Sequence, residues 1–132
     1  MTLNEMNGLL IFERKIVRKI FGPKIGQLGE FERRSNQEIM NLLGGESIVK
    51  FVKAQRLRWL GHLTRMNEDR AQKRVQSAIV HSGRKKGRPR LRWIDCAGED
   101  LKAMGVCNWK RLAGDRVEWR RIVDQAKAHT GL

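Results

Sequence analysis

The 132-residue chain has few cysteines and no long apolar run, and both shortages exclude whole classes of protein. Its two cysteines, Cys96 and Cys107, form neither a disulfide framework nor a CxxC pair, so we expect reduced thiols in an intracellular protein. No apolar stretch reaches the roughly 18 residues that cross a bilayer. The first 15 residues also lack the basic lead and long apolar run of a signal peptide. The length suits about one domain of ~100 to 150 residues, so two large catalytic domains cannot fit.

Acidic residues are also scarce, and most of the shortage is local. The chain holds 28 Lys and Arg against 14 Asp and Glu, which gives a formal charge of +14. Residues 47–92 hold fourteen basic and two acidic residues, whereas residues 1–46 and 93–132 each hold seven basic and six acidic ones. With 40% apolar residues, the chain is too apolar for a fully disordered tail. Positive charge gathered in one segment attracts polyanions, so the sequence predicts a polyanionic partner.

Apolar residues recur at helical spacing along most of the chain, and no window alternates long enough to predict a sheet. The expected fold is therefore all-α, a small domain of about five to six helices with a basic Gly/Arg/Pro loop between the fourth and the fifth. Ser35 and Glu38 have the spacing of a capping box, and two glycines at residues 44 and 45 end that helix. The expected helices cover residues 4–21, 36–43, 47–66, 70–77, 93–104 and 108–126. Asn108 is the expected cap of the last helix, which Gly114-Asp115 can break into two pieces.

The segment from His81 to Arg92 is the only low-complexity stretch, with six basic residues among the nine from Arg84 on. Its glycines and proline predict a loop or arm, not core. The Gly-Arg-Pro sequence at residues 87–89 has the shape of an AT-hook, which lies extended in the minor groove of A·T-rich DNA. Nonspecific phosphate contact explains the same residues without groove insertion and is the favoured interpretation. Both interpretations stay open.

The helix expected over residues 47–66 places a tryptophan among cations. An exposed Trp59 beside Arg58 could stack on an unpaired base, but its place on the apolar stripe favours a core residue. Gly61 is expected to destabilise this helix by about 1 kcal/mol relative to alanine, because glycine has a low helix propensity. The core interpretation extends to the other three tryptophans, Trp93, Trp109 and Trp119.

The histidines, cysteines and carboxylates show no zinc-ligand spacing, so we expect no metal and no cofactor. Asp95 and Asp100 with Lys102 loosely resemble the carboxylates and lysine of a metal-dependent nuclease. Their spacing suits the solvent face of an ordinary helix, which is the favoured interpretation. A nuclease would instead need Mg²⁺ and would lose activity on the replacement Asp100→Ala. No Ser-His-Asp grouping, phosphate-binding glycine loop or polymerase Asp-Asp signature is present, so no enzymatic activity is expected.

An ordered series of short motifs runs along almost the whole chain, from about residue 9 to residue 123. The series comprises residues 13–23 (ERKIVRKIFGP), 56–66 (RLRWLGHLTRM), 87–93 (GRPRLRW), Glu99–Leu101, Trp109, Asp115-Arg116 and Trp119-Arg120. It resembles the carboxy-terminal region of non-LTR retrotransposon polyproteins, the endonuclease-reverse transcriptases of the jockey and RTE type. The first motif is similar to the segment that follows the polymerase core in that family.

The resemblance implies a thumb-like and post-thumb helical region that helps to grip template RNA or target DNA. The polymerase and endonuclease residues of the family, and the Cys/His zinc knuckle of some members, have no counterpart here, so neither catalysis nor zinc-based recognition is carried over. We expect the chain to be a fragment of a longer protein. Its expected divisions are a helical thumb-like region (residues 1–80), a basic linker or arm (81–92), a C-terminal helical pair (93–127) and a frayed tail (128–132).

We therefore expect a nuclear, nucleic-acid-binding fragment without chemistry of its own, which binds RNA or DNA; the polymerase domain of its parent protein is a second candidate partner. Trp93 would anchor the arm to the helical core. The residues expected to contact phosphate are Lys50, Lys53, Arg56, Arg58, Arg84, Lys85, Lys86, Arg88, Arg90 and Arg92. Two alternatives remain: a helical protein-interaction module with a large exposed apolar patch, and an AT-hook-like binder of the DNA minor groove.

Overall fold

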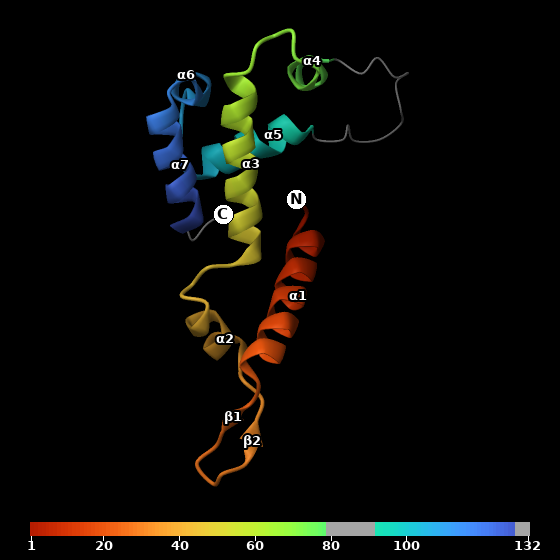
Figure 1. Ribbon diagram of the computed structural model, residues 1–132, viewed down its shortest axis with the longest axis vertical. Coiled ribbons are helices and arrows are strands. Elements are labelled where there is room, and N and C mark those ends of the chain that lie inside the picture. The colour runs from red at the N-terminus through yellow and green to blue at the C-terminus, as the bar shows by residue number, and fades with distance from the viewer. Residues whose placement is uncertain (79–91, 129–132) are drawn as a thin grey trace. The chain divides into compact units, whose positions relative to one another are not determined.

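The structure is a computed structural model that describes residues 1–78 and 92–128 (Figure 1). These residues form a mostly helical protein, as predicted, with seven helices and one small hairpin in the described part. The helices are α1 (Leu3–Phe21), α2 (Asn36–Leu42), α3 (Ile48–Thr64), α4 (Ala71–Ser77), α5 (Trp93–Ala103), α6 (Trp109–Gly114) and α7 (Arg116–Ala128). The predicted tail from residue 129 and the predicted arm, except Arg92, lie outside the described residues.

The described residues gather into two compact units, Met1–Val52 and Lys53–Leu132, which meet inside α3. The first unit contains α1, the hairpin, α2 and the first turn of α3. Its buried side chains are Val17, Ile39 and Val49. α3 is joined to α1 through its first amide, because Ile48 N donates to the Glu13 carboxylate at 2.6 Å. Ser47 caps α3 as predicted, with its hydroxyl accepting from Lys50 N at 3.3 Å.

The hairpin pairs β1 (Lys24–Ile25) with β2 (Phe31–Glu32) in antiparallel register, so that Lys24 lies opposite Glu32. The expectation that the chain contains no sheet is wrong at this one place. Strands of two residues are too short to produce the alternation that predicts a strand. An ion pair of 3.2 Å joins Lys24 Nζ to the Glu32 carboxylate and holds the two strands together.

The predicted capping box at the start of α2 is confirmed. The Ser35 hydroxyl accepts from Glu38 N at 3.2 Å, and the Glu38 carboxylate accepts from Ser35 N at 2.6 Å. Lys24 Nζ donates to the same carboxylate at 2.9 Å and thereby ties the hairpin to α2. The hydrogen bond from Lys24, with that from the Ser35 amide next in weight, lowers the pKa of Glu38 from 4.5 to about 2.

This lowered pKa makes the effect of Glu38→Gln depend on pH. A carboxyl group whose pKa is lower in the folded state stabilises the fold above its unfolded pKa, and it loses that contribution as the pH falls towards its folded pKa. The wild type is therefore expected to melt at a higher temperature than Glu38→Gln above about pH 4.5, with the difference shrinking towards pH 2. Thermal melts across this pH range measure the difference, with Glu46→Gln as an exposed control. A difference that stays constant down to pH 2 would contradict the ionic origin.

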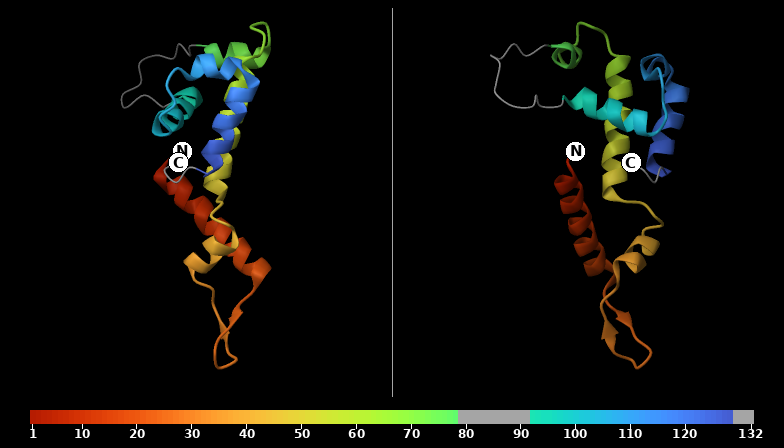
Figure 2. Two further views of the ribbon diagram at one scale, coloured as in Figure 1. Left: turned by 90° about the vertical axis from the view of Figure 1, so that its left-hand side faces the viewer. Right: turned by 180° about the vertical axis from the view of Figure 1, so that it is seen from behind.

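The core of the second unit is built by α3, α5, α6 and α7. Figures 1 and 2 show α7 beside α3 and α5 crossing α3. At its centre Trp119 is only 2% exposed, and its Nε1 donates to the Leu57 carbonyl oxygen at 2.9 Å. The members of the buried cluster are Ala54, Leu57, Leu60, Ala97, Leu101, Ala113, Trp119, Ile122, Val123 and Ala126.

Residues at the helix ends of the second unit set where the helices begin and end as predicted, except at Asn108. Gly105, at φ 71°, ends α5 as predicted. The predicted break at Gly114-Asp115 is present, and the Asp115 carboxylate accepts from Val117 N at 2.7 Å to begin α7. The prediction that Asn108 caps α6 is wrong in mechanism, because Asn108 has φ 54° and its side chain makes no capping bond. Within the described residues, no helix combines the length and the apolar character needed to cross a membrane.

The four tryptophans do not share one environment. Trp119 lies in the core, and Trp109 is partly buried against it. Trp59 and Trp93 are 47% and 40% exposed, so the core interpretation is wrong for both. The buried positions of α3 in the second unit are instead Ala54, Leu57, Leu60, Gly61 and Leu63. Because successive helical residues are about 100° apart, Trp59 falls just outside the edge of this buried face.

Candidate nucleic-acid interface

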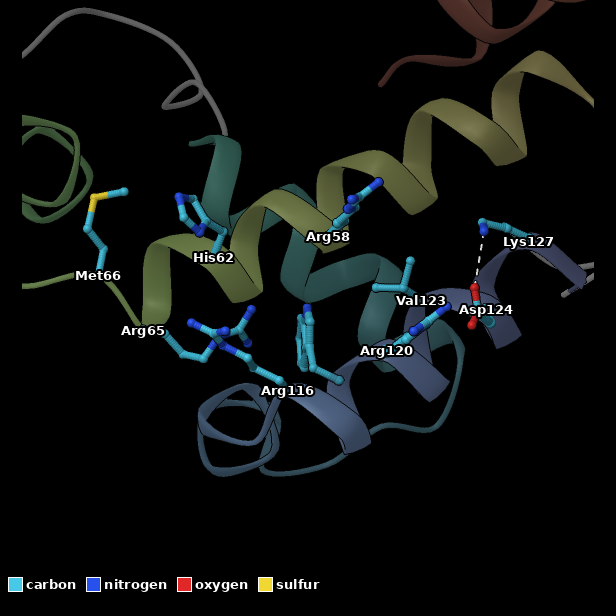
Figure 3. Close-up of a pocket in the computed structure, with 10 residues that line it drawn as sticks. Arg58, His62, Arg65, Met66, Arg116, Arg120, Val123, Asp124 and Lys127 are labelled. Carbon is cyan, nitrogen blue, oxygen red and sulfur yellow. Dashed lines mark hydrogen bonds and ion pairs between the residues drawn. The ribbon is translucent and has the colours of Figure 1, made fainter.

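A basic groove with a volume of about 670 Å³ lies in the second unit, between α3 and α7 (Figure 3). Five Lys and Arg side chains line it against a single carboxylate, that of Asp124. The residues that define the basic groove are Arg58, His62, Arg65, Met66, Arg116, Trp119, Arg120, Val123, Asp124 and Lys127.

Helical spacing brings these side chains to facing sides of the groove. On the α3 side, Arg58 and His62 are four residues apart and share one face of the helix. On the α7 side, Arg116 and Arg120 repeat the same spacing, and Lys127 continues their stripe. The buried indole of Trp119 joins the two helices beneath them, through its hydrogen bond to α3.

Four of the five cations have no acidic partner among the described residues. The guanidinium groups of Arg58, Arg116 and Arg120 have no carboxylate within ion-pair distance among the residues that the structure describes. Arg65 Nη1 donates to the Ala113 carbonyl oxygen at 2.6 Å, which leaves its charge uncompensated. Lys127 alone is paired, at 3.1 Å from Asp124, as the dashed line in Figure 3 marks. The groove therefore holds several exposed charges that a polyanion would neutralise.

The predicted phosphate-binding residues are distributed unevenly over the structure. Arg58 lies in the basic groove. Lys50 belongs to the first unit, where its Nζ donates to the Gly45 carbonyl oxygen at 3.3 Å. Arg92 is exposed just before α5, and its Nε lies 3.6 Å from the Asp95 carboxylate. Five predicted residues lie outside the described part of the chain: Arg84, Lys85, Lys86, Arg88 and Arg90.

Lys53 and Arg56, which were also predicted to contact phosphate, are instead held by a buried carboxylate. Arg56 Nη2 donates to Asp100 Oδ2, and Lys53 Nζ lies 3.7 Å from Asp100 Oδ1. The side chains of all three are only 11% to 12% exposed. Charges that are paired and largely withdrawn from solvent contribute less to capturing a polyanion than the free arginines of the groove.

The residues predicted to contact phosphate do not include four basic residues of the groove, Arg65, Arg116, Arg120 and Lys127. Three of them lie in residues 93–132, a segment that is nearly neutral as a whole. A segment's net charge hides how its charges divide between the faces of a helix. The four-residue spacing of Arg116 and Arg120 was the one available signal.

The carboxylates that suggested a nuclease do not form a metal site. Asp100 is paired with Arg56 and Lys53, and Asp95 is paired with Arg92 at the start of α5. Across residues 1–78 and 92–128, no three His, Cys, Asp or Glu side chains gather as metal ligands would. No residue of the described part is therefore assigned to hold a metal.

Comparisons with protein-family models, with curated proteins and with solved structures find no match to this chain. The resemblance to retrotransposon proteins therefore stays a prediction from the sequence motifs.

Proposed function

We propose that this chain binds the phosphate backbone of RNA or DNA through its basic groove, as a nucleic-acid-binding region of a retrotransposon reverse transcriptase protein. The observation that carries the proposal is the convergence of five cations, contributed by two helical segments far apart in the sequence, around one carboxylate. Such a cluster repels itself in the absence of a partner and is relieved when phosphates replace the counterions.

The sequence supports the same proposal from outside the groove. The surplus of positive charge in residues 47–92 includes six basic residues in the predicted arm. An arm and a groove that both bind phosphates would track the backbone over a longer distance than either would alone. The motif series adds the expectation that this nucleic acid is the template or the target of a nuclear element.

The groove arginines are expected to set the affinity and its salt dependence. If the protein contacts about six phosphates on duplex DNA, log affinity falls with log salt at a slope of about −5. The double replacement Arg116→Ala/Arg120→Ala should lower the affinity at least about tenfold and make the slope shallower by nearly 2, since each lost phosphate contact removes about 0.9. Fluorescence anisotropy with labelled duplex DNA and structured RNA, between about 50 and 200 mM salt, measures both quantities.

Arg121→Ala is the matched control for these replacements. Arg121 lies on the same helix and is equally charged, but it does not line the groove and is paired with Glu118 at 3.0 Å. Its replacement should change the affinity less than about twofold, because an exposed pair one turn apart contributes little charge to a partner elsewhere. Equal losses in the control and in the groove variant would indicate nonspecific attraction to the whole molecule. A wild-type slope near zero would remove the proposed function.

Exposed apolar side chains favour a second function, packing on the polymerase domain of the parent protein. In the first unit, large apolar residues of α1 and the hairpin remain more than half exposed: Leu3, Ile11, Phe12, Ile20, Ile25, Leu28 and Phe31. Apolar residues exposed in such number mark protein interaction surfaces. The anisotropy titrations with DNA and RNA separate the two functions. If the chain does not bind nucleic acid, or binds it with no dependence on salt, only packing on the polymerase domain remains.

A further inference from the structure

Trp59 stands on the surface of α3 beside the ring of His62. The ring centroids are 5.2 Å apart and the ring planes are inclined by 42°. Trp59 is 47% exposed, although an indole is the side chain that gains most from burial. His62 is exposed as well, so the pair presents aromatic surface to solvent.

This aromatic pair adjoins the basic groove. His62 is one of the groove's lining residues, and Arg58 precedes Trp59 directly in the helix. His62 and Met66 also line a second hollow of about 400 Å³, to which Arg70 contributes a further cation. His62 therefore lines both hollows, and Trp59 lies against it.

We propose that the basic groove binds single-stranded nucleic acid, with an unpaired base stacked on Trp59 while the groove arginines hold the adjoining phosphates. This inference rests on the proposed function and specifies its ligand. An aromatic face and a cationic track side by side are the two elements from which single-strand binding sites are built. In a duplex each base face already stacks on its neighbours, so an exposed indole gains little there.

The surroundings of Trp59 favour a base over a partner protein. The centres of protein interfaces are depleted of charged residues, whereas Trp59 directly follows Arg58 and contacts a residue of the basic groove. A base, in contrast, arrives attached to phosphates that need those cations. Stacking on an indole also tolerates any base, which suits a site whose other contacts are with the backbone.

Trp59→Leu is expected to weaken binding to a single strand about tenfold, since stacking on one aromatic side chain contributes on that scale. Affinity for duplex DNA should change less than about twofold, because the groove cations remain. Anisotropy measurements would use oligo(U) and oligo(dT) of about 12 nucleotides, so that RNA and DNA are tested separately, together with a duplex of similar length. Trp93→Leu is the matched control, since Trp93 is 40% exposed but, unlike Trp59, has no ring contact with a groove residue in the described part of the chain.

Tryptophan fluorescence provides a second readout that does not depend on affinity. Stacking of a base on Trp59 should quench the emission of the wild type, and Trp59→Phe should lose most of that quenching while Trp93→Phe keeps it. Loss of single-strand affinity in Trp59→Leu with duplex affinity retained supports the inference.

Three outcomes would overturn it: equal losses for single strand and duplex, no loss for either, or unchanged quenching in Trp59→Phe. If Trp59→Leu changes only the self-association or protein binding of the chain, Trp59 belongs to a protein interface and the inference also fails. Arg116→Ala/Arg120→Ala distinguishes these failures from failure of the proposed function, because that variant should lose affinity for every probe whether or not a base stacks on Trp59.

Discussion

Replacing Gly61 with alanine is expected to destabilise the protein by about 3 kcal/mol, although alanine is the better helix former. A Cβ atom at residue 61 would overlap with Nε1 and Cδ1 of Trp119. That indole is buried and fixed by its hydrogen bond to the Leu57 carbonyl oxygen, so it cannot move aside freely. Overpacking at such a site costs about 1 to 3 kcal/mol or more, which outweighs the helix propensity gain of about 1 kcal/mol once the hydrogen bond is also disturbed. Urea denaturation followed by circular dichroism measures the change.

Two comparisons test whether contact with Trp119 is the cause. Gly98→Ala places a methyl group inside α5, where it meets no atom within 4 Å, and should stabilise by about 0.5 to 1 kcal/mol. In a Trp119→Leu background the overlap disappears, so Gly61→Ala should there be neutral or stabilising. An equal cost in both backgrounds would show that the indole does not exclude the methyl group.

The replacement Asp100→Ala is expected to cost about 3 to 5 kcal/mol, the range found when one partner of a buried ion pair is removed. Asp100 is 8% exposed and neutralises both Arg56 and Lys53. Without its carboxylate, two cations would remain close together in a largely desolvated site, and Arg56 Nε already has no hydrogen-bond partner among the described residues. Urea denaturation at low and high salt measures the loss. Salt should recover little of it, because a buried pair is poorly screened.

Asp124→Ala is the matched control for Asp100→Ala. Its carboxylate is 56% exposed and is paired with Lys127 one turn away, so its removal should cost less than about 1 kcal/mol. Replacing all three buried groups with apolar residues, as in Asp100→Leu/Arg56→Met/Lys53→Met, should recover most of the stability lost in Asp100→Ala. If the triple variant is no more stable than Asp100→Ala, the loss does not come from the uncompensated cations.

These stability experiments also bear on function, because the same core positions the basic groove. Trp119 is both a lining residue of the groove and the side chain that joins α7 to α3. A variant that displaces Trp119 should therefore lower nucleic-acid affinity together with stability, whereas Arg116→Ala/Arg120→Ala should lower affinity alone. Measuring both properties for each variant separates residues that form the groove from residues that contact the ligand.

Signals spanning only a few residues predicted the helix boundaries well. The capping box of Ser35 and Glu38, the cap at Ser47 and the glycine stop at Gly105 all work through bonds and dihedral angles within one turn. The hairpin was missed because each strand has only two residues, which is too short for a pattern.

Which side chains are buried and which charges are paired depends on the face of each helix that packs against another helix. Apolar periodicity alone does not decide that. Trp59 and Leu60 are neighbours in sequence, yet one is exposed and the other fully buried. Lys53 and Arg56 counted as free charges in the sequence, but Asp100 lies beside them in the fold. Gly61 was expected to weaken α3, whereas the packing of Trp119 requires a glycine there.

The sequence by itself determined the helical class, the ends of most helices and the large positive surplus, because each follows from composition or from interactions within a few residues. Only the tertiary structure decided which cations converge, since Arg58 and Arg120 come together through the packing of α3 against α7. Helices that are distant in sequence meet through buried contacts such as the one between Trp119 and Leu57. Those contacts depend on the shapes of both partners, and neither segment contains that information alone.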